Sequence, residues 1–300
     1  MAETDMRRFD GVAVVGAGAA GVSAAVEAAR LGARVLILEA SGRAGGVVRL
    51  AHEVRNFPGG ARTGAGIAEM FGAQVVQWGI PLERRLVKSV TAGAGRVVLA
   101  DGGGWALEAA AAVVATGTAP VMPEIPGMPA SFGQDSGVFS SACSALAGIP
   151  PSSAAVIGGF DVAFDQARLL AGRGVATCVL CRRRVPAAPP WLVEAARTEG
   201  VAILSGLEVS KVCGRAGEWR LETAGSGGMA DGPVPVVESV VIAVGRKPVL
   251  PVMDCGASPL VRVAGDALGR PGRYLSAAMA DGCLAVRDLL CGGVSNGGLR

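Results

Sequence analysis

Apolar residues in this chain gather in short runs that end in glycine, a pattern typical of parallel strands joined to helices. The first run, at positions 12–15, leads through Gly16, Gly18 and Gly21 into an alanine-rich stretch that ends at Leu31. Gly16 suits a tight turn, Gly18 the approach of a pyrophosphate, and Gly21 close packing of helix on strand. The pattern predicts a dinucleotide site with the pyrophosphate at the N-terminus of the helix.

The next apolar run supports the same interpretation. Positions 35–38 follow Gly32 as a second strand, and Glu39 ends that strand. A carboxylate at this distance from the first glycine accepts hydrogen bonds from a ribose 2'-hydroxyl and disfavours a 2'-phosphate. Three spaced glycines are a weak signal in a chain with 46 glycines. Strand, helix, second strand and acidic residue together favour a dinucleotide fold over a chance turn.

Further periodic segments predict the rest of the first domain. Helical spacing of apolar residues indicates helices over 63–79 and 275–290. Two short strand signals, 86–90 and 96–99, flank a glycine turn and predict a small antiparallel layer. A further apolar strand precedes Ala115-Thr116-Gly117.

The opening pattern then repeats. Positions 155–157 run into Gly158, a helix follows to about Leu170, and another strand ends at Leu180. The first motif begins at Gly16 and the second at Gly158, a spacing far too long for a solenoid repeat, which indicates a duplicated nucleotide-binding architecture. We therefore expect an α/β fold with two Rossmann-like domains, the second inserted in the first. The first domain comprises 1–120 plus 236–300, and the second 121–235.

Bulk properties exclude several classes. The net charge of +3 comes from scattered arginines, and with 4% aromatic residues there is no stacking platform for nucleic acid. The longest uncharged apolar run, 11–26, is too short and too rich in glycine for a membrane span. The irregular spacing of the cysteines suits a reducing compartment. We expect a cytoplasmic protein.

Several motifs together resemble a known family. They are the two glycine motifs, Asn56-Phe57-Pro58-Gly59, Ala115-Thr116-Gly117, Ala243-Val244-Gly245 and Gly265-Asp266. Over roughly residues 10–290 the chain resembles low-molecular-weight thioredoxin reductase and, more broadly, the pyridine nucleotide-disulfide oxidoreductase superfamily. The resemblance implies FAD in the first domain, NADPH in the inserted one, and a homodimer.

The same resemblance assigns roles to residues of the first domain. It places Gly16, Gly18 and Gly21 at the FAD pyrophosphate and Glu39 at the adenosine ribose. It places Val87 near the adenine, Gly45, Gly46 and Asn56 beside the isoalloxazine, Thr116 and Gly117 near the middle of the cofactor, and Asp266 at the ribityl-phosphate portion. Further cofactor-binding residues that it implies are Ala40, Ala115 and Gly265.

The second glycine motif gives two conflicting indications. Counting from Gly158 by the distance that separates Gly16 from Glu39 reaches Cys181, followed by Arg182-Arg183-Arg184. The missing acidic residue and the guanidinium groups favour NADPH over NADH. The middle glycine, however, is replaced by Phe160, whose side chain blocks the close approach of a pyrophosphate unless it rotates away. Both alternatives, a working and a degenerate nicotinamide site, remain open.

The redox centre also departs from the family that the chain resembles. Thioredoxin reductases carry a Cys-x-x-Cys just before the second glycine motif, and Ser141 and Ser144 occupy those positions here. Cys143 lies between them, as a filler or a lone reactive thiol. Cys178 and Cys181 form a Cys-x-x-Cys within a predicted strand, where residues three apart point to opposite faces and do not form a disulfide.

These observations favour an FAD-dependent oxidoreductase that moves electrons between NADPH and an acceptor other than thioredoxin. An iron-sulfur protein, a quinone and a small molecule are the candidate acceptors. One alternative is a degenerate nicotinamide site with ferredoxin or another protein as the electron donor, and another is a non-catalytic flavin-binding subunit. No acid, base, nucleophile or metal site is assigned, although His52, the only histidine, precedes Asn56 and could transfer protons.

Overall fold

The computed structural model describes residues 5–58, 60, 62–93, 95–225, 235–271 and 274–292. The chain divides into two compact units. Unit 1 comprises 1–49, 54–119 and 247–300, and unit 2 comprises Leu50–Glu53 and Pro120–Arg246. Gly59 of the expected Asn-Phe-Pro-Gly turn lies outside the described residues.

The sheet of unit 1 has a parallel core of dinucleotide-binding type. It contains eight strands, in the spatial order β17 (Val252–Asp254), β4 (Ser89–Gly93), β5 (Arg96–Ala100), β6 (Trp105–Val114), β1 (Asp5–Val15), β2 (Val35–Glu39) and β3 (Leu82–Arg84), with β18 (Val261–Val263) paired to β6. Strand β1 is parallel to both β2 and β6, whereas β4, β5 and β6 are antiparallel neighbours. The predicted antiparallel layer is therefore confirmed.

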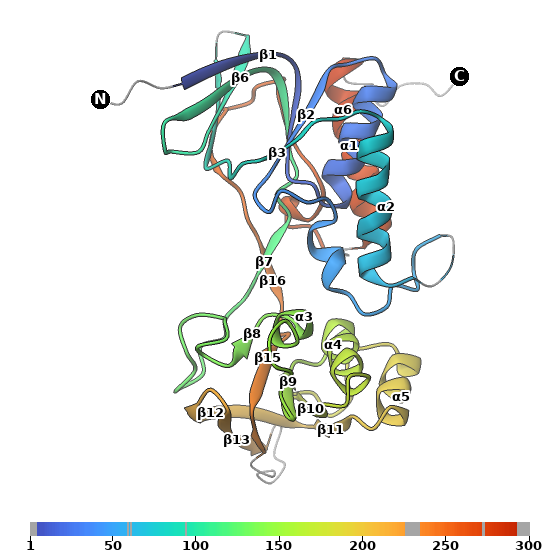
Figure 1. Ribbon diagram of the computed structural model, residues 1–300, viewed down its shortest axis with the longest axis vertical. Helices are drawn as coiled ribbons and strands as arrows, with labels where there is room; N and C mark the ends of the chain where they lie inside the picture. Colours follow the sequence, from blue (N-terminus) through green and yellow to red (C-terminus); the bar gives the residue numbers. More distant parts are fainter. Residues whose placement is uncertain are drawn as a thin grey trace. The chain divides into compact units, whose positions relative to one another are not determined.

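Alternate residues of the strands in unit 1 face two different layers. Val12, Val14 and Ile37 pack against the helices, which are α1 (Ala19–Arg30), α2 (Gly64–Gln77) and α6 (Leu275–Leu290). Figure 1 shows these three helices side by side. Ala13 and Leu38 face the β4–β5 layer instead. Strand β2 and residues 12–15 of β1 are buried on both faces, which explains why they are continuous apolar runs.

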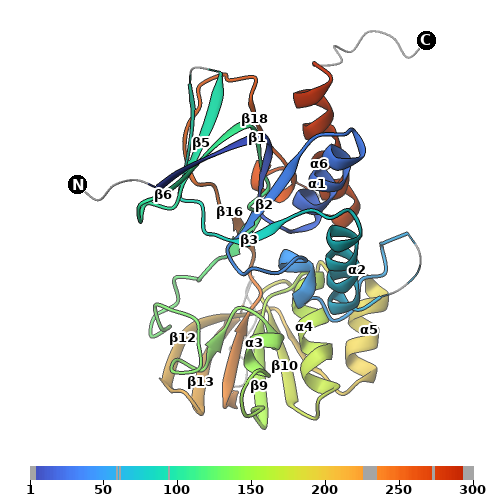
Figure 2. The same cartoon turned by 45° about the horizontal axis from the view of Figure 1, so that its top comes forward.

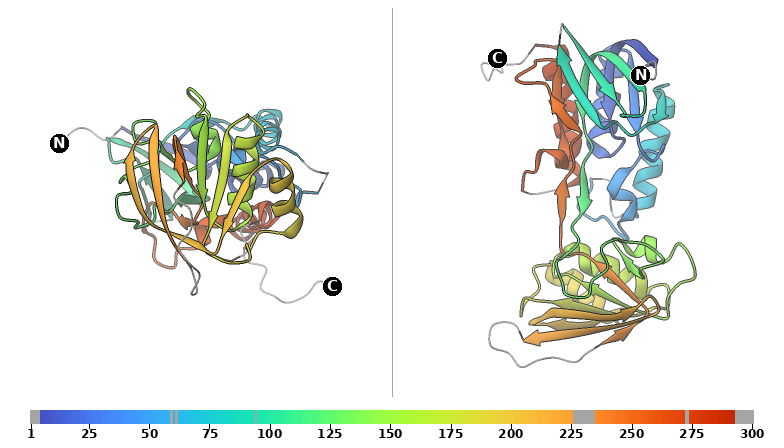
Figure 3. Two further views of the ribbon diagram at one scale, coloured as in Figure 1. Left: turned by 90° about the horizontal axis from the view of Figure 1, so that it is seen from below. Right: turned by 90° about the vertical axis from the view of Figure 1, so that its left-hand side faces the viewer.

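Unit 2 repeats this arrangement with a fully parallel sheet. Its strands, in spatial order, are β11 (Ala202–Ser205), β10 (Ala176–Cys181), β9 (Ser153–Ile157), β15 (Ser239–Ile242) and β8 (Val138–Phe139). Helices α3 (Ala142–Ala145), α4 (Asp161–Ala171) and α5 (Pro190–Thr198) contribute to the core on one face. On the other face lie β12 (Leu207–Arg215), β13 (Glu218–Gly225) and β14 (Val236–Val237). Figures 2 and 3 show these layers.

The remaining elements are short. They are the 3-10 helices η1 (Gly46–Leu50) and η2 (Gly265–Leu268) and the paired strands β7 (Thr118–Pro120) and β16 (Arg246–Pro248). The expected α/β fold with two Rossmann-like domains, the second inserted in the first, is confirmed. No helix in the described part of the chain is long and apolar enough to cross a membrane.

Two element boundaries differ from the sequence prediction. The strand expected over 86–90 instead starts at Ser89, because Leu86 and Val87 lie outside the sheet and line a cavity. The helix expected over 63–79 is α2, which ends at Gln77, with Trp78 as its C-cap. Thr63 caps its start by accepting a hydrogen bond from the Gly66 N–H at 3.1 Å.

Candidate functional site

The first glycine turn joins β1 to α1 and requires glycine at two positions. Gly16 has φ +101°, and a side chain there would clash with the Ala115 carbonyl that follows the adjoining strand β6. Gly21 lies in the first part of α1, where a Cβ would collide with the Gly16 carbonyl. The helix therefore packs directly on the turn, as the sequence pattern predicts.

Gly18 differs from these two because its backbone does not require glycine. It is the N-cap of α1 with φ −75°, which any residue adopts. The nearest atom to a Cβ built there is the Gly46 Cα at 4.0 Å, so the space beside it is open. No acidic residue lies in the first turn of α1 and the N-cap provides no side-chain acceptor. The helix N-terminus is thus free to bind an anion.

Glu39 ends β2 next to the same turn. Its Oε2 accepts a hydrogen bond from the Ala17 N–H at 2.7 Å, and its Oε1 accepts from the Ser41 N–H and hydroxyl, each at 2.9 Å. These contacts fix the orientation of the carboxylate before any ligand binds. A ribose hydroxyl in this place would meet a pre-positioned acceptor.

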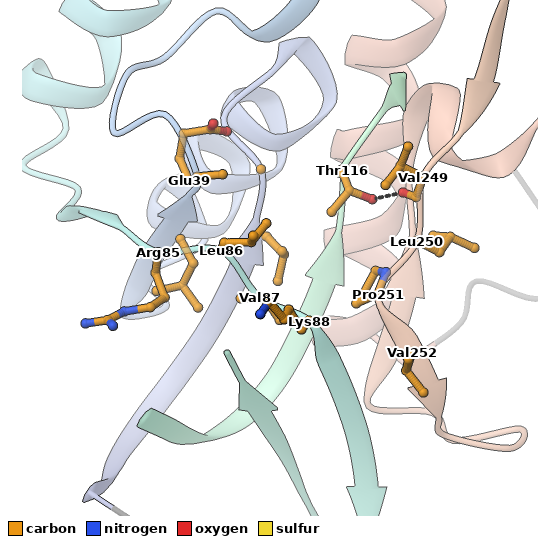
Figure 4. Close-up of a pocket in the computed structure, with 14 residues that line it drawn as sticks. Glu39, Arg85, Leu86, Val87, Lys88, Thr116, Val249, Leu250, Pro251 and Val252 are labelled. Atoms are coloured by element: carbon orange, nitrogen blue, oxygen red, sulfur yellow. Dashed lines mark hydrogen bonds between the residues drawn. The ribbon is translucent and has the colours of Figure 1, made fainter. Parts of the chain in front are cut away.

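A cavity of about 370 Å³ extends from Gly16 and Glu39. Ala40, Val87 and Thr116, all predicted site residues, also line it, and the Thr116 hydroxyl donates to the Val249 carbonyl. Figure 4 shows Glu39 on one side and Thr116 with Val249 on another. Sequence reasoning missed further lining residues: Arg85, Leu86, Lys88, Val249, Leu250, Pro251 and Val252. Arg85, Leu86 and Lys88 could have been found only because they lie close to Val87 in the sequence. Residues 249–252 contain no motif that would have indicated them.

Two more predicted segments close around the start of α1. Gly46 has φ +55°, and a Cβ there would lie 2.9 Å from the Gly18 Cα, while the Gly45 N–H donates to the Ala17 carbonyl at 2.7 Å. On another side, a Cβ on Gly265 would lie 2.6 Å from the Ala20 Cβ, and Asp266 follows in η2. Side chains at Gly46 or Gly265 would fill this space.

The other predicted residues of the first site are more scattered. The Ala115 N–H donates to the Val15 carbonyl at 2.8 Å, so Ala115 continues the pairing of the sheet. Gly117 has open space around it, and Asn56 is exposed. The FAD that the resemblance implies fits unit 1, because Gly16 and Glu39 line the cavity and the N-terminus of α1 has open space beside Gly18.

The second glycine turn has the same backbone plan. The Gly158 N–H donates to the Leu180 carbonyl at 3.0 Å, as the Gly16 N–H does to Leu38 at 2.8 Å. A Cβ on Gly158 would lie 2.5 Å from the Ala243 carbonyl, which corresponds to Ala115 in the first turn. The duplicated motif therefore folds as predicted.

The second turn differs at the position where a pyrophosphate would approach. Phe160 is the N-cap of α4 and is 54% exposed, and the acidic residue Asp161 begins the helix. The Arg183 guanidinium lies over the Phe160 ring at 5.6 Å from its centroid. Arg182 pairs with Glu208 at 3.3 Å on the surface. Both arginines thus already have partners within unit 2.

The cysteines of β10 are placed as the strand prediction requires. Cys181 is buried at the strand end, where a Cβ on Gly159 would lie 2.6 Å from its sulfur. Burial raises the pKa of the Cys178 thiol to about 11 and also raises the pKa of Cys181. Thiols so disposed are poor nucleophiles.

Ser141 and Ser144 form a hydrogen-bonded pair. Ser141 caps α3, and its hydroxyl lies 2.9 Å from that of Ser144 and accepts from the Ser144 N–H at 3.2 Å. Cys143 is half-buried with its sulfur 3.7 Å from the Leu50 carbonyl. Burial, and secondly the Asp165 charge, raises the pKa of the Cys143 thiol. The described residues contain no group of acidic, cysteine or histidine side chains arranged to hold a metal ion.

Comparison with known proteins agrees with this geometry. A family described as pyridine nucleotide-disulphide oxidoreductase matches residues 10–259. Mercuric reductase of Acidithiobacillus ferrooxidans is 28% identical over 94% of this chain and 60% of its own. Thioredoxin reductase of Helicobacter pylori is 28% identical over 68% of this chain and 66% of its own. The chain therefore covers less than two thirds of the length of each of these relatives.

Solved structures show the same fold. The crystal structure of T. acidophilum thioredoxin reductase superimposes with a TM-score of 0.85, 23% identity, and coverage of 96% of this chain and 100% of the other. Thioredoxin reductase of Lactococcus lactis gives a TM-score of 0.83 at 21% identity, over 94% of this chain and 98% of the other.

Proposed function

Because the chain belongs to the pyridine nucleotide-disulphide oxidoreductase family, we propose that it is an FAD-dependent oxidoreductase whose electron acceptor is not thioredoxin. The observation that carries the second part is the Ser141–Ser144 pair, which occupies the positions expected for a redox dithiol. Two hydroxyl groups cannot form a disulfide or exchange with one. An iron-sulfur protein, a quinone or a small molecule then takes the electrons.

FAD fits the site that the first glycine turn, the N-terminus of α1 and Glu39 form in unit 1. The N-terminus of α1 with Gly16, Gly18 and Gly21 would hold the pyrophosphate, and Glu39 the ribose hydroxyls. When bound, the flavin supplies the redox chemistry. The remaining proposed binding residues are Ala40, Gly45, Gly46, Asn56, Val87, Ala115, Thr116, Gly117, Gly265 and Asp266.

For the electron donor we propose NADPH, held by unit 2 beginning at Gly158. Cys181 stands where NADH would need an acidic residue, and Arg182 and Arg183 follow it. A 2'-phosphate would draw these guanidinium groups from their present partners, Glu208 and the Phe160 ring. NADPH would give up two electrons and a proton as hydride; the two electrons go to the acceptor, and the proton goes to the acceptor or to solvent. From the resemblance we also propose a homodimer with FAD in unit 1 and the nucleotide in unit 2, so that residues 236–246, expected in the FAD domain, belong with the nucleotide. From the cysteine spacing we propose a cytoplasmic location.

A second candidate follows from the start of α4. Phe160 places a ring where Gly18 of the first turn leaves open space, and Asp161 adds negative charge where a pyrophosphate would bind. In this candidate, the flavin receives electrons from ferredoxin or another protein donor.

An anaerobic absorbance titration of the purified holoprotein with NADPH and, separately, NADH tests both candidates. We expect a yellow protein whose flavin absorbance is lost stoichiometrically with NADPH. A flavin that stays oxidised with both nucleotides but is reduced by dithionite would contradict the NADPH proposal and support the protein donor. A colourless protein that takes up no FAD would contradict the flavoprotein proposal itself. A flavin that accepts electrons from no physiological class of donor would identify a non-catalytic subunit.

A further inference from the structure

The segment Leu50–Glu53 belongs to unit 2, although the residues before and after it belong to unit 1. It lies between Gly46 and Asn56, the two residues that the proposed function places beside the isoalloxazine. Residues of α4 and α3 hold it through polar contacts. These contacts are not required by the dinucleotide-binding pattern of either unit.

Asp165 of α4 makes two of the contacts with one carboxylate. Its Oδ2 accepts a hydrogen bond from the His52 N–H at 2.8 Å, and its Oδ1 accepts from the Glu53 N–H at 2.9 Å. Both oxygens are therefore committed to consecutive backbone groups. Such a bidentate contact fixes the direction of the peptide as well as its position.

Gln166 and Arg168 extend the attachment, and both are buried, at 4% and 8% exposed. The Gln166 amide donates to the Leu50 carbonyl at 2.9 Å and accepts from the Ala142 N–H of α3 at 2.6 Å. The Arg168 guanidinium pairs with Glu53 at 3.0 Å and, through its other nitrogens, with Glu199 of unit 2 at 2.6 Å. A buried network with its members satisfied in this way rigidifies what it holds.

We propose that Asp165, Gln166 and Arg168 are positioning residues for the flavin site, which order the chain between Gly46 and Asn56 by fixing Leu50–Glu53. The proposal rests on the proposed function, since it takes the flavin to lie beside Gly46 and Asn56. Anchoring Leu50–Glu53, which continues from η1, leaves the connection to Asn56 fewer accessible conformations. His52 contributes to this anchoring through its backbone N–H.

The test compares Asp165→Asn with Glu194→Gln in the FAD-loaded protein. Asparagine presents an NH₂ group to one of the two backbone N–H donors, so one hydrogen bond is lost and replaced by a donor–donor contact. Glu194→Gln removes a carboxylate of unit 2 that pairs with Arg197 on the surface, outside the network that holds Leu50–Glu53, and is the matched control.

Amide hydrogen exchange of the peptide containing His52 and Glu53, and the visible circular dichroism and reduction potential of the flavin, are the readouts. We expect at least tenfold faster exchange and a changed flavin spectrum and potential in Asp165→Asn, with wild-type values in Glu194→Gln. Unchanged exchange would overturn the anchoring. Faster exchange with an unchanged flavin spectrum and potential would overturn the positioning role. If the purified wild-type protein takes up no FAD, the proposed function itself is contradicted. This outcome is seen before any variant is made, so it is distinguished from failure of the positioning proposal.

A second variant covers the case in which Asp165→Asn does not fold. Glu53→Gln removes only the partly exposed carboxylate through which the segment meets Arg168. We expect the same direction of change in exchange and flavin spectrum, smaller in size, because the two Asp165 contacts remain. Wild-type behaviour of Glu53→Gln in both measurements would count against the proposal.

Discussion

At the scale of single residues, the two glycine motifs differ in one side chain with large consequences. Gly18 and Phe160 are both helix N-caps with extended backbone, so φ does not distinguish them. What distinguishes them is the side chain: the space beside Gly18 is open, whereas Phe160 carries a half-exposed ring that lies under the Arg183 guanidinium. We therefore expect the capacity of unit 2 for a dinucleotide to depend on this position.

Replacing Phe160 by glycine tests this steric argument. We expect Phe160→Gly to lower the dissociation constant for NADPH at least tenfold, because the ring leaves the pyrophosphate position and Arg183 loses its aromatic partner. Calorimetric titration of both proteins measures the change. Val185→Ala, at another exposed apolar residue of unit 2, is the control and should leave the constant unchanged. Equal affinities of Phe160→Gly and wild type would show that the ring does not obstruct the site.

Cys143 is a second single-residue case. Its thiol is half-buried against the Leu50 carbonyl and has a raised pKa, so little thiolate forms near neutral pH. We expect Cys143→Ser to keep the rate of flavin reduction by its donor within about twofold, and iodoacetamide to label Cys143 more slowly than the exposed Cys291. Mass spectrometry of the labelled peptides gives the order of reaction. Loss of flavin reduction in Cys143→Ser would show that the thiol takes part in the reaction, and would contradict this prediction.

At the scale of elements, α1 and α6 are joined by a charged contact on an otherwise apolar interface. Glu27 of α1 is 9% exposed, and its carboxylate accepts from Arg30 at 2.7 Å and from Arg287 of α6 at 2.7 Å. The hydrogen bond from Arg30, aided by Arg287 and opposed by burial, lowers the pKa of Glu27 from 4.5 to about 2. Helix α1 carries the proposed pyrophosphate site at its other end, so this contact helps to hold it.

The lowered pKa predicts a defined pH dependence. Since the folded state binds the Glu27 proton less tightly than the unfolded state, the stabilisation is complete above about pH 4.5 and is lost as the pH falls towards about 2. The shift corresponds to at most about 3 kcal/mol, and we expect on the order of 2 kcal/mol because both arginines are partly exposed to solvent.

Denaturant unfolding of wild type and Glu27→Gln at pH values between roughly 2.5 and 7 measures how the free energy of unfolding depends on pH. The variant should lose about 2 kcal/mol at pH 7 and be less sensitive to acid than wild type. Glu194→Gln, which breaks an exposed Glu–Arg pair of the same spacing in α5, is the matched control and should cost less than about 1 kcal/mol. An equal loss in both variants would show that burial of Glu27 adds nothing.

At the scale of the whole molecule, one architecture is used twice with different outcomes. In both units a strand turns through glycine into a helix, and the N–H of the first glycine donates to the end of the neighbouring strand. The first unit keeps an acidic residue, Glu39, at the end of that strand, whereas the second has Cys181. The duplication therefore supplies two scaffolds, and side chains at a few fixed positions decide what each can hold.

The duplication could be predicted from the sequence because the signals that indicate it are local. Apolar runs, glycine spacing and helix stops act between near neighbours in the chain, and they correctly predicted the fold class, the boundaries of α6 and the strand position of Cys178 and Cys181. The position of residues 86–88 was missed because β-propensity favours a strand there, while packing directs these residues into the cavity wall.

The sequence by itself thus determined the two glycine turns and the replacement of the middle glycine of the second turn by Phe160. Only the tertiary structure decided that residues 249–252 face Thr116, and that α4 holds Leu50–Glu53. The physical reason is separation along the chain. Thr116 and Val249 are 133 residues apart, and His52 and Asp165 are 113 apart, so no periodicity or local propensity links them before the chain has folded.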